Sequence, residues 1–180
     1  MHIRIASESD AEAIAAIVRE SFADQARALG MDPAVNPGFF WFEDGERVLR
    51  DMAEGAHAAL GFIDGEPAGT VRWTRRRDSS DEGHIRRLAI LPRFRGAGRG
   101  DSLMAFAEAR MREAGMRIAS LGIIAQFGKL QEYYERLGYR FRERKTFDDF
   151  AFECIIMAKS LEAQSPTGAC ACAPASLERR

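Results

Sequence analysis

The stretch from Leu88 to Gly100 constrains the fold more than any other part of this sequence. It reads Leu-Ala-Ile-Leu-Pro-Arg-Phe-Arg-Gly-Ala-Gly-Arg-Gly. The apolar half predicts a strand that Pro92 ends, because proline cannot donate to a ladder of strand hydrogen bonds. The second half predicts a glycine-rich turn, and apolar residues at helical spacing then predict a helix over about 99–114 that Gly115 ends. A strand, a glycine-rich turn and a helix in this order are typical of an anion-binding site.

The turn suits an anion because the first turn of a helix leaves backbone N–H groups unpaired, and glycine lets a phosphate approach them. Arg95 and Arg99 are predicted to add charge-assisted donors. Two nucleotide motifs are disfavoured. A Walker-type phosphate loop requires Gly-Lys-Ser/Thr, whereas Gly100 precedes Asp101. A dinucleotide fingerprint requires an acidic residue closing the next strand, which here ends at residues 122–125 in Gly-Ile-Ile-Ala.

Periodicity along the rest of the chain predicts further strands and helices. Strands are expected from alternating or short apolar runs, and the pair Asp64-Gly65 suits the positive φ of a tight hairpin. A helix is expected after Ser9, which forms a capping-box pattern with Glu12. The expected elements are strand 2–6, a first helix through Phe22, helix 46–54, strands 57–63, 68–74 and 83–91, helix 99–114, strand 117–124, helix 128–137, and strands 139–145 and 150–159.

Composition and charge limit the class of protein. The 180 residues match one domain, with 46% hydrophobic and 29% charged residues. A formal net charge of -1 gives no reason to expect a nucleic acid or a membrane as a partner. The N-terminus has no apolar signal core and no apolar stretch is long enough to span a membrane, so a soluble, cytoplasmic protein is expected.

The three cysteines argue against both disulfides and a metal site. Cys154 lies in an apolar run, while Cys170 and Cys172 lie in a C-terminal stretch rich in Ala, Pro and Ser. Because these positions form neither a Cys-x-x-Cys pair nor a Cys/His cluster, no metal is expected. Residues 1–161 are expected to form the folded domain, and residues 162–180 a disordered tail.

The motif in the turn resembles that of the GNAT superfamily of acyl-CoA-dependent N-acyltransferases, Gln/Arg-x-x-Gly-x-Gly/Ala after a strand. Arg95, Gly98 and Gly100 occupy its three defined positions. The Leu-Ala-Ile-x-Pro lead-in and the run Tyr133–Tyr139 are also similar to the family, and the resemblance covers about residues 1–161. It implies an α/β (α+β) fold, with a central, mixed, mostly antiparallel twisted sheet of about six or seven strands. About four helices would flank this sheet, which would be splayed between its fourth and fifth strands.

The resemblance also implies acetyl-CoA as the acyl donor, with its pyrophosphate on the backbone amides of the turn. The strand before the turn would hydrogen-bond the pantetheine arm like an extra strand. The implied contacts are Arg95, Gly96, Ala97, Gly98, Arg99 and Gly100 for the pyrophosphate, and Leu88, Ala89 and Ile90 for pantetheine. The family often has an asparagine seven residues before its tyrosine, where this chain has Phe127, and Gln126 is the candidate to replace that contact.

In such an enzyme the acyl group passes directly from the thioester to an amine, which must be neutral to attack. An alkylamine with a pKa near 10.4 is neutral in about one molecule per thousand at pH 7, so a base is useful. The family often places Glu or His near the position of His84, the first candidate base, and Glu82 is the second, acting through water. Tyr134 matches the family's tyrosine acid for the departing thiolate. The alternative for His84 is a surface histidine at the start of a strand, without a catalytic role. The alternative for Tyr134 is packing in the core, since Tyr133 and Tyr134 cannot both point inward.

The acceptor is expected to be a primary amine of a small molecule or a peptide. In this superfamily acceptor choice lies mostly in two segments, here residues 30–54 and 145–150. Phe39–Phe42 form either a wall of the acceptor pocket or the anchor of a loop. Nearby acidic residues either attract a cationic amine or form a solvated face: Asp32, Glu43, Asp44 and Glu46. The oligomeric state is open, a homodimer included.

Two other classes of function stay open on the sequence. One is a sensor that binds acyl-CoA without turnover, and the less favoured one is an RNA-binding domain that uses Arg75–Arg77. That triplet lacks the interleaved aromatic residues of proteins that bind single strands. Residues 70–100 hold nine arginines against three acidic residues, a local positive patch that is expected to surround the phosphate site.

Overall fold

The strands of this chain form one mixed sheet. The computed structural model describes residues 1–32, 34, 40, 42–148 and 150–162, so the expected tail lies almost wholly outside the described residues. Within them seven strands follow the order β1-β2-β3-β4-β5-β7-β6, and all neighbours are antiparallel except β4 and β5. The strands are β1 His2–Ile5, β2 His57–Ile63, β3 Glu66–Arg75, β4 Glu82–Ile90, β5 Ile118–Ile124, β6 Arg140–Phe147 and β7 Phe150–Ser160.

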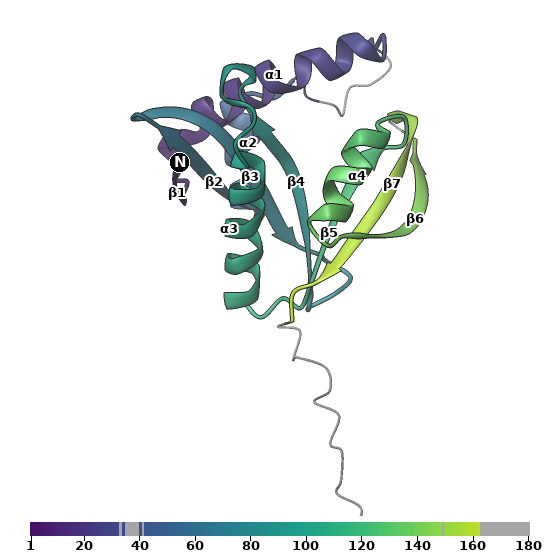
Figure 1. Cartoon of the computed structure of the whole chain (residues 1–180). Coiled ribbons are helices and arrows are strands. Elements are labelled where there is room, and N and C mark those ends of the chain that lie inside the picture. The colour runs from purple at the N-terminus through teal and green to yellow at the C-terminus, as the bar shows by residue number, and fades with distance from the viewer. Residues whose placement is uncertain (33, 35–39, 41, 149, 163–180) are drawn as a thin grey trace, which may run out of the picture.

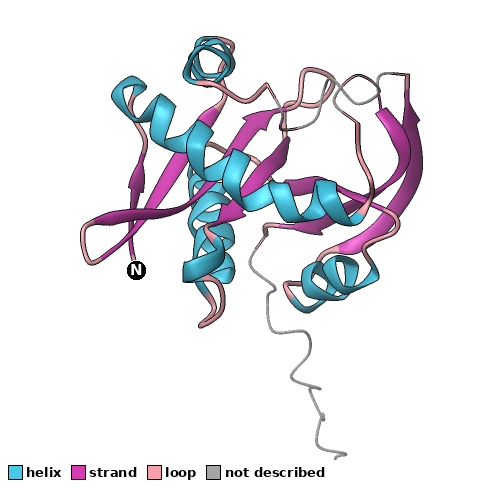
Figure 2. Cartoon of the chain, turned by 90° about the horizontal axis from the view of Figure 1, so that it is seen from above, coloured by secondary structure: helices cyan, strands magenta, loops and turns pink. Residues whose placement is uncertain are grey.

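Helices cover both faces of this sheet (Figures 1 and 2). They are α1 Ala11–Ala28, α2 Gly45–Ala53, α3 Arg99–Glu113 and α4 Gly128–Arg136. Ile14 of α1 and Val48 of α2 are buried in one hydrophobic cluster, whereas Leu103 of α3 and Tyr134 of α4 are buried in a second. The expected fold, a mostly antiparallel sheet flanked by four helices, is confirmed in the described residues.

The parallel pair β4–β5 is short and opens into a gap. Pairing runs from Glu82 opposite Ile118 to Ile85 opposite Leu121 and stops there, although both strands continue. Figure 1 shows the two strands meeting at one end and diverging toward the other. The splay expected between the fourth and fifth strands is therefore confirmed. It leaves the edge of β4 beyond Ile85 without a strand partner on that side among the described residues.

A β-bulge bends β4 where the gap begins. The pairing of β3 with β4 shifts register between Thr70 and Arg72, so that Val71 faces two residues of β4, one of them Arg87. Arg87 has a φ of 56°, in the left-handed region that non-glycine residues rarely adopt. Since a bulge bends its strand and increases the local twist, it accounts for the divergence of β4 from β5.

The capping prediction for the first helix was wrong. α1 begins at Ala11 rather than just after Ser9, because a 3₁₀ turn over residues 8–10 comes first. Glu12 does not reach back to cap its own helix. Its Oε2 accepts a hydrogen bond from the N–H of Gly45 at 3.2 Å, which ties the start of α2 to α1.

Candidate active site

A cavity of about 330 Å³ occupies the gap between β4 and β5. Residues of both strands line it, together with residues of α1, α4 and the hairpin of β6 and β7. His84 of β4 and Tyr134 of α4 are both in this lining, and Glu82 is not. The structure thus brings together two of the three residues predicted to be catalytic.

A second, smaller hollow of about 180 Å³ adjoins the cavity on the side of the glycine-rich turn. It shares Phe22, Gln25 and Leu88 with the cavity lining. The rest of its lining includes three predicted coenzyme-binding residues, Ala89, Ile90 and Arg95. The two hollows therefore lie next to each other along β4, between Arg95 at the start of the turn and His84.

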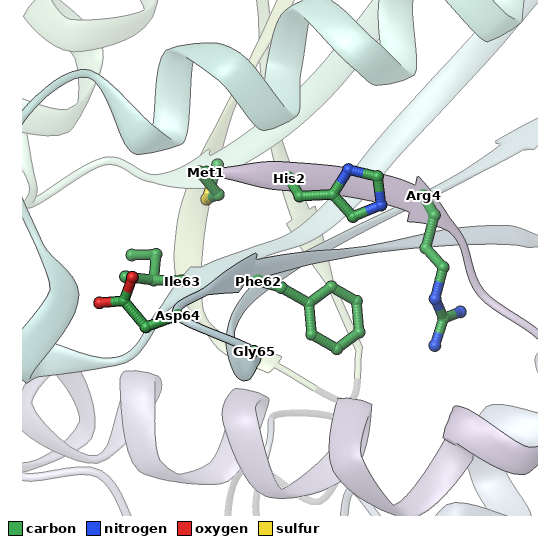
Figure 3. A pocket seen from close by; sticks show the side chains of 7 residues that line it. All are labelled: Met1, His2, Arg4, Phe62, Ile63, Asp64 and Gly65. Carbon is green, nitrogen blue, oxygen red and sulfur yellow. The ribbon is translucent and has the colours of Figure 1, made fainter.

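A larger hollow, of about 510 Å³, lies toward the other edge of the sheet. Figure 3 shows the seven residues that line it, from β1, β2 and the turn between β2 and β3. In the strand order β1 is an edge strand, three positions from β4. Because no predicted catalytic or coenzyme-binding residue is in this lining, we assign the candidate active site to the β4–β5 gap.

The turn before α3 presents unpaired backbone N–H groups. Gly96, Ala97 and Gly98 have φ values of 90°, 50° and 66°, three consecutive residues in the left-handed region. Their N–H groups, and that of Gly100, donate no hydrogen bond to any described residue. The positive end of the helix dipole lies at the same place. N–H groups arranged in this way fit the pyrophosphate of coenzyme A.

The two arginines of the turn bind backbone carbonyls. Arg95 Nη2 donates to the carbonyl oxygen of Ser21 at 2.8 Å, which ties the turn to α1. Arg99 Nη1 donates to the carbonyl oxygen of Phe94, also at 2.8 Å. The backbone N–H groups of the turn are open to an anion, and a contact from either arginine side chain stays a prediction.

His84 is held in its neutral form. Its Nδ1 lies 3.2 Å from the Oγ of Ser120 on β5. Burial, and next to it the positive charge of Arg86, lower the pKa of His84 from 6.5 to about 4. At pH 7 the ring is therefore unprotonated, which is the form that can accept a proton.

Tyr134 is held in its protonated form. The residue is 7% exposed, and burial raises the pKa of its hydroxyl well above the usual value. Its ring packs edge-on against Tyr133, with centroids 5.0 Å apart. Tyr133 points toward the turn instead, because a Cβ added at Gly100 would lie 2.7 Å from its hydroxyl oxygen. Of the two tyrosines, only Tyr134 is in the described lining of the cavity, although both pack against the same hydrophobic cluster.

Comparison with known proteins agrees with this geometry. A family model described as the acetyltransferase (GNAT) family matches residues 12–139, a range that includes the turn, His84 and Tyr134. The chain belongs to the GNAT family. No curated protein matches it.

Solved structures of acetyltransferases share this fold at low identity. The PaiA N-acetyltransferase of Thermoplasma acidophilum, in complex with coenzyme A, is 18% identical, with a TM-score of 0.71 over 89% of this chain and 99% of that chain. The ribosomal-protein-S18-alanine N-acetyltransferase of Escherichia coli is 17% identical, with a TM-score of 0.70 over 92% and 97%. An aminoglycoside 6'-acetyltransferase type Ii is 15% identical, with a TM-score of 0.69 over 92% and 100%.

Apart from the turn residues 96–100, two predicted site residues of this GNAT chain lie outside both hollows, Glu82 and Gln126. Glu82 pairs with Arg142 at 2.9 Å. Although burial raises the pKa of Glu82, hydrogen bonds from Ser120 and Arg142 outweigh it and lower that pKa overall. A carboxylate held in this way is a poor proton acceptor. Gln126 is exposed on the turn before α4, whereas its neighbour Phe127 lines the cavity.

The aromatic wall of the cavity differs from the predicted one. Phe39 and Trp41 lie outside the described residues. Phe40 is buried and stacks on Phe22 with ring centroids 6.2 Å apart, and Phe42 is exposed. Among the described residues, the phenylalanines that line the cavity come from other segments: Phe22, Phe127, Phe147 and Phe150. Phe147 and Phe150 lie in segment 145–150, one of the two where acceptor choice was expected, whereas Phe22 has the spacing of an ordinary core residue.

The acidic residues before and within α2 stabilise the fold. Glu43 is buried and forms ion pairs with Arg72 of β3 and with Arg87 of the bulge, the latter at 3.1 Å. Asp44 accepts a hydrogen bond from the N–H of Arg47 at 2.7 Å and so caps α2. Neither interpretation of the acidic segment, as an attractor of amines or as a solvated face, holds for Glu43.

The nine arginines of residues 70–100 do not form one patch. Arg72 and Arg86 both pair with Asp51 of α2, at 2.6 and 3.1 Å, and Arg87 pairs with Glu43. Asp51 and Glu43 lie outside residues 70–100, so the charge of that stretch alone does not include them. The expected positive patch around the phosphate site was therefore wrong in extent, because long-range ion pairs offset much of it.

Two further observations concern the described residues only. They contain no group of three or more His, Cys, Asp and Glu side chains placed to hold a metal ion. None of their helices is both long enough and apolar enough to cross a membrane.

Proposed function

We propose that this GNAT protein transfers an acetyl group from acetyl-CoA directly to a primary amine of a small molecule or a peptide. The observation that carries the proposal is a neutral histidine and a protonated tyrosine, His84 and Tyr134, in the lining of one cavity. That cavity adjoins a hollow that reaches Arg95, the residue before the turn whose N–H groups are unpaired among the described residues. One site therefore combines an anion-binding turn, an open strand edge and an acid–base pair.

The turn and the open edge of β4 would hold acetyl-CoA, which supplies the acetyl group as a thioester. The N–H groups of Gly96, Ala97, Gly98 and Gly100 fit its pyrophosphate, because they are unpaired among the described residues and the helix dipole favours negative charge there. The backbone of Leu88–Ile90 would hydrogen-bond the pantetheine amides, as an added strand pairs with a sheet edge. A contact from Gln126 stays a prediction.

His84 would accept one proton in the reaction, and Tyr134 would donate another. The amine nitrogen forms an amide bond with the acetyl carbon as the bond from that carbon to sulfur breaks. His84 takes the proton that leaves nitrogen, directly or through water, and Tyr134 donates a proton to the sulfur. Burial favours the required starting form of both groups at pH 7, since it lowers the pKa of the histidine and raises that of the tyrosine.

The solved structures are consistent with this proposal. The PaiA enzyme was solved with coenzyme A bound. The names of the other two enzymes specify an alanine of a ribosomal protein and an aminoglycoside as acceptors. Both acceptor classes carry amines, and they span the range from peptide to small molecule that we propose.

Thermal stabilisation by acetyl-CoA tests the coenzyme assignment. A ligand at 100 times its Kd stabilises a protein by about 2.7 kcal/mol, which for a domain of this size raises Tm by about 5–10 °C. Gly100→Ala should weaken the shift, because its Cβ would lie 2.7 Å from the Tyr133 hydroxyl oxygen beside the turn. Gly128→Ala is the matched control at another helix start, where a Cβ meets nothing within 4 Å. No shift of the wild type at millimolar acetyl-CoA would refute the assignment.

A further inference from the structure

The polar groups that line the cavity are neutral or cationic. They belong to Gln25, His84, Arg86, Arg87 and Cys154, together with the hydroxyl of Tyr134. The other described residues of the lining are Gly122 and residues with apolar side chains. No Asp or Glu among the described residues is in this lining. A cationic acceptor would therefore meet guanidinium groups in the described lining and no carboxylate there, since Asp51 and Glu43 pair with these arginines from outside it.

Arg86 has unused capacity to bind an anion. Its side chain is 40% exposed, and its Nε is a buried donor with no partner among the described residues. Its ion pair with Asp51, at 3.1 Å, is shared with Arg72, which approaches the same carboxylate oxygen at 2.6 Å. Because Asp51 is already engaged by a closer guanidinium, it leaves part of the charge of Arg86 uncompensated.

Arg86 stands beside the candidate base. His84 and Arg86 are two residues apart on β4, before the bulge, so their side chains share one face of the strand, about 7 Å apart at the backbone. An amine that approaches His84 would thus bring a group a few bonds away within reach of Arg86. The guanidinium geometry matches a carboxylate, to which it can donate two parallel hydrogen bonds.

We infer that Arg86 binds a carboxylate of the acceptor, so that the enzyme selects small amines that carry both an acidic group and an apolar or aromatic group. This inference rests on the proposed function. Phe22, Phe127, Phe147 and Phe150 would contact the apolar group. A volume of about 330 Å³ is at the lower end of the range of about 300–1,000 Å³ for small-molecule sites, which favours an amino-acid-like acceptor over a folded partner.

A panel of three amines tests the inference by release of free thiol from acetyl-CoA. L-phenylalanine carries the carboxylate, phenethylamine is the same amine without it, and spermidine is a polycation. The wild type should have the highest kcat/KM with L-phenylalanine. Arg86→Gln should lower that value by about 10- to 100-fold, the range expected for hydrogen bonds to a charged group, and should leave phenethylamine and the KM for acetyl-CoA nearly unchanged.

Arg50→Gln is the matched control. It removes an exposed guanidinium from α2, the helix that carries Asp51, and should leave all three amines unaffected. Equal use of phenethylamine and L-phenylalanine by the wild type, or a preference for spermidine, overturns the inference without any variant. An equal loss on both aromatic amines in Arg86→Gln also overturns it. Thiol release with other amines would then leave the proposed function standing, whereas no release with any amine refutes both.

Discussion

Glu43 is expected to be the most important acidic residue for the stability of this GNAT domain. Its side chain is 0% exposed and pairs with Arg72, whose side chain is 1% exposed. It also pairs with Arg87, the left-handed residue of the β4 bulge. Glu43→Ala would leave a buried guanidinium without this counter-charge and would release the bulge from the segment before α2.

The size of the effect follows from burial. Removing one partner of a buried ion pair costs about 3–5 kcal/mol, because the other charge stays buried without a partner. Arg72 retains Asp51 at 2.6 Å, which limits its loss, so we expect the lower half of that range. One kcal/mol shifts Tm by about 2–4 °C in a domain of this size, and the expected drop is therefore about 6–16 °C.

Urea unfolding and thermal melting measure this effect against a matched control. Glu46→Ala removes a carboxylate three residues away whose side chain is 86% exposed and whose ion pair with Arg50 spans 3.9 Å. It should change stability by less than about 0.5 kcal/mol. Glu43→Gln keeps the volume and removes only the charge, so it should cost nearly as much as Glu43→Ala. A loss below about 1 kcal/mol for Glu43→Ala would show that the cluster does not stabilise the fold as reasoned here.

Two further predictions concern the candidate catalytic pair. Tyr134→Phe removes the hydroxyl but keeps the packing in the cavity wall, so it should slow thiol release at least about 10-fold. The Kd of acetyl-CoA, measured by titration calorimetry, should stay nearly unchanged. Unaltered turnover would exclude Tyr134 as the acid. His84 has a folded-state pKa of about 4 against an ordinary value of 6.5, so its contribution to stability is complete above pH 6.5 and is lost as the pH falls toward 4. Between pH 7 and pH 4 the wild type should therefore lose up to about 3 kcal/mol more unfolding free energy than His84→Gln in urea titrations, and parallel pH profiles would contradict a buried neutral histidine.

The elements of the fold were predictable because their signals are local. The strand that ends at Pro92, the turn and the helix that follows come from adjacent residues, and the structure has β4, the turn and α3 in those places. The hairpin signal Asp64-Gly65 lies between β2 and β3, and both residues have positive φ. The splay between β4 and β5 came from the resemblance to GNAT proteins rather than from periodicity, since no local pattern reports where a pair of strands separates.

The buried charges were not predictable from local patterns. Glu43 pairs with arginines 29 and 44 positions further along the chain, and its neighbours in sequence resemble a solvated acidic turn. The bulge had no signal either, because its left-handed residue is Arg87 and not a glycine or an asparagine. Only the three-dimensional arrangement shows that these two unusual features contact each other.

The site was predictable where chemistry requires a residue type and unpredictable where it requires a shape. His84 and Tyr134 could be proposed because an acid and a base have few possible identities, and both line the cavity. The wall was predictable only in part, because Phe147 and Phe150 lie in the expected acceptor segment 145–150, whereas Phe22 matches an ordinary core position of α1. The period of two of a strand already places Arg86 on the face of His84, but only the structure shows that its ion pair with Asp51 is shared with Arg72.

The most direct test of the account is the release of free thiol from acetyl-CoA, measured with a panel of primary amines and followed by mass spectrometry of the amine. The account predicts release that depends on an amine, equal amounts of thiol and of singly acetylated amine, and strong slowing in Tyr134→Phe. Binding of acetyl-CoA without thiol release for any amine would contradict it. That result would indicate that this GNAT domain senses acyl-CoA and does not transfer the acyl group.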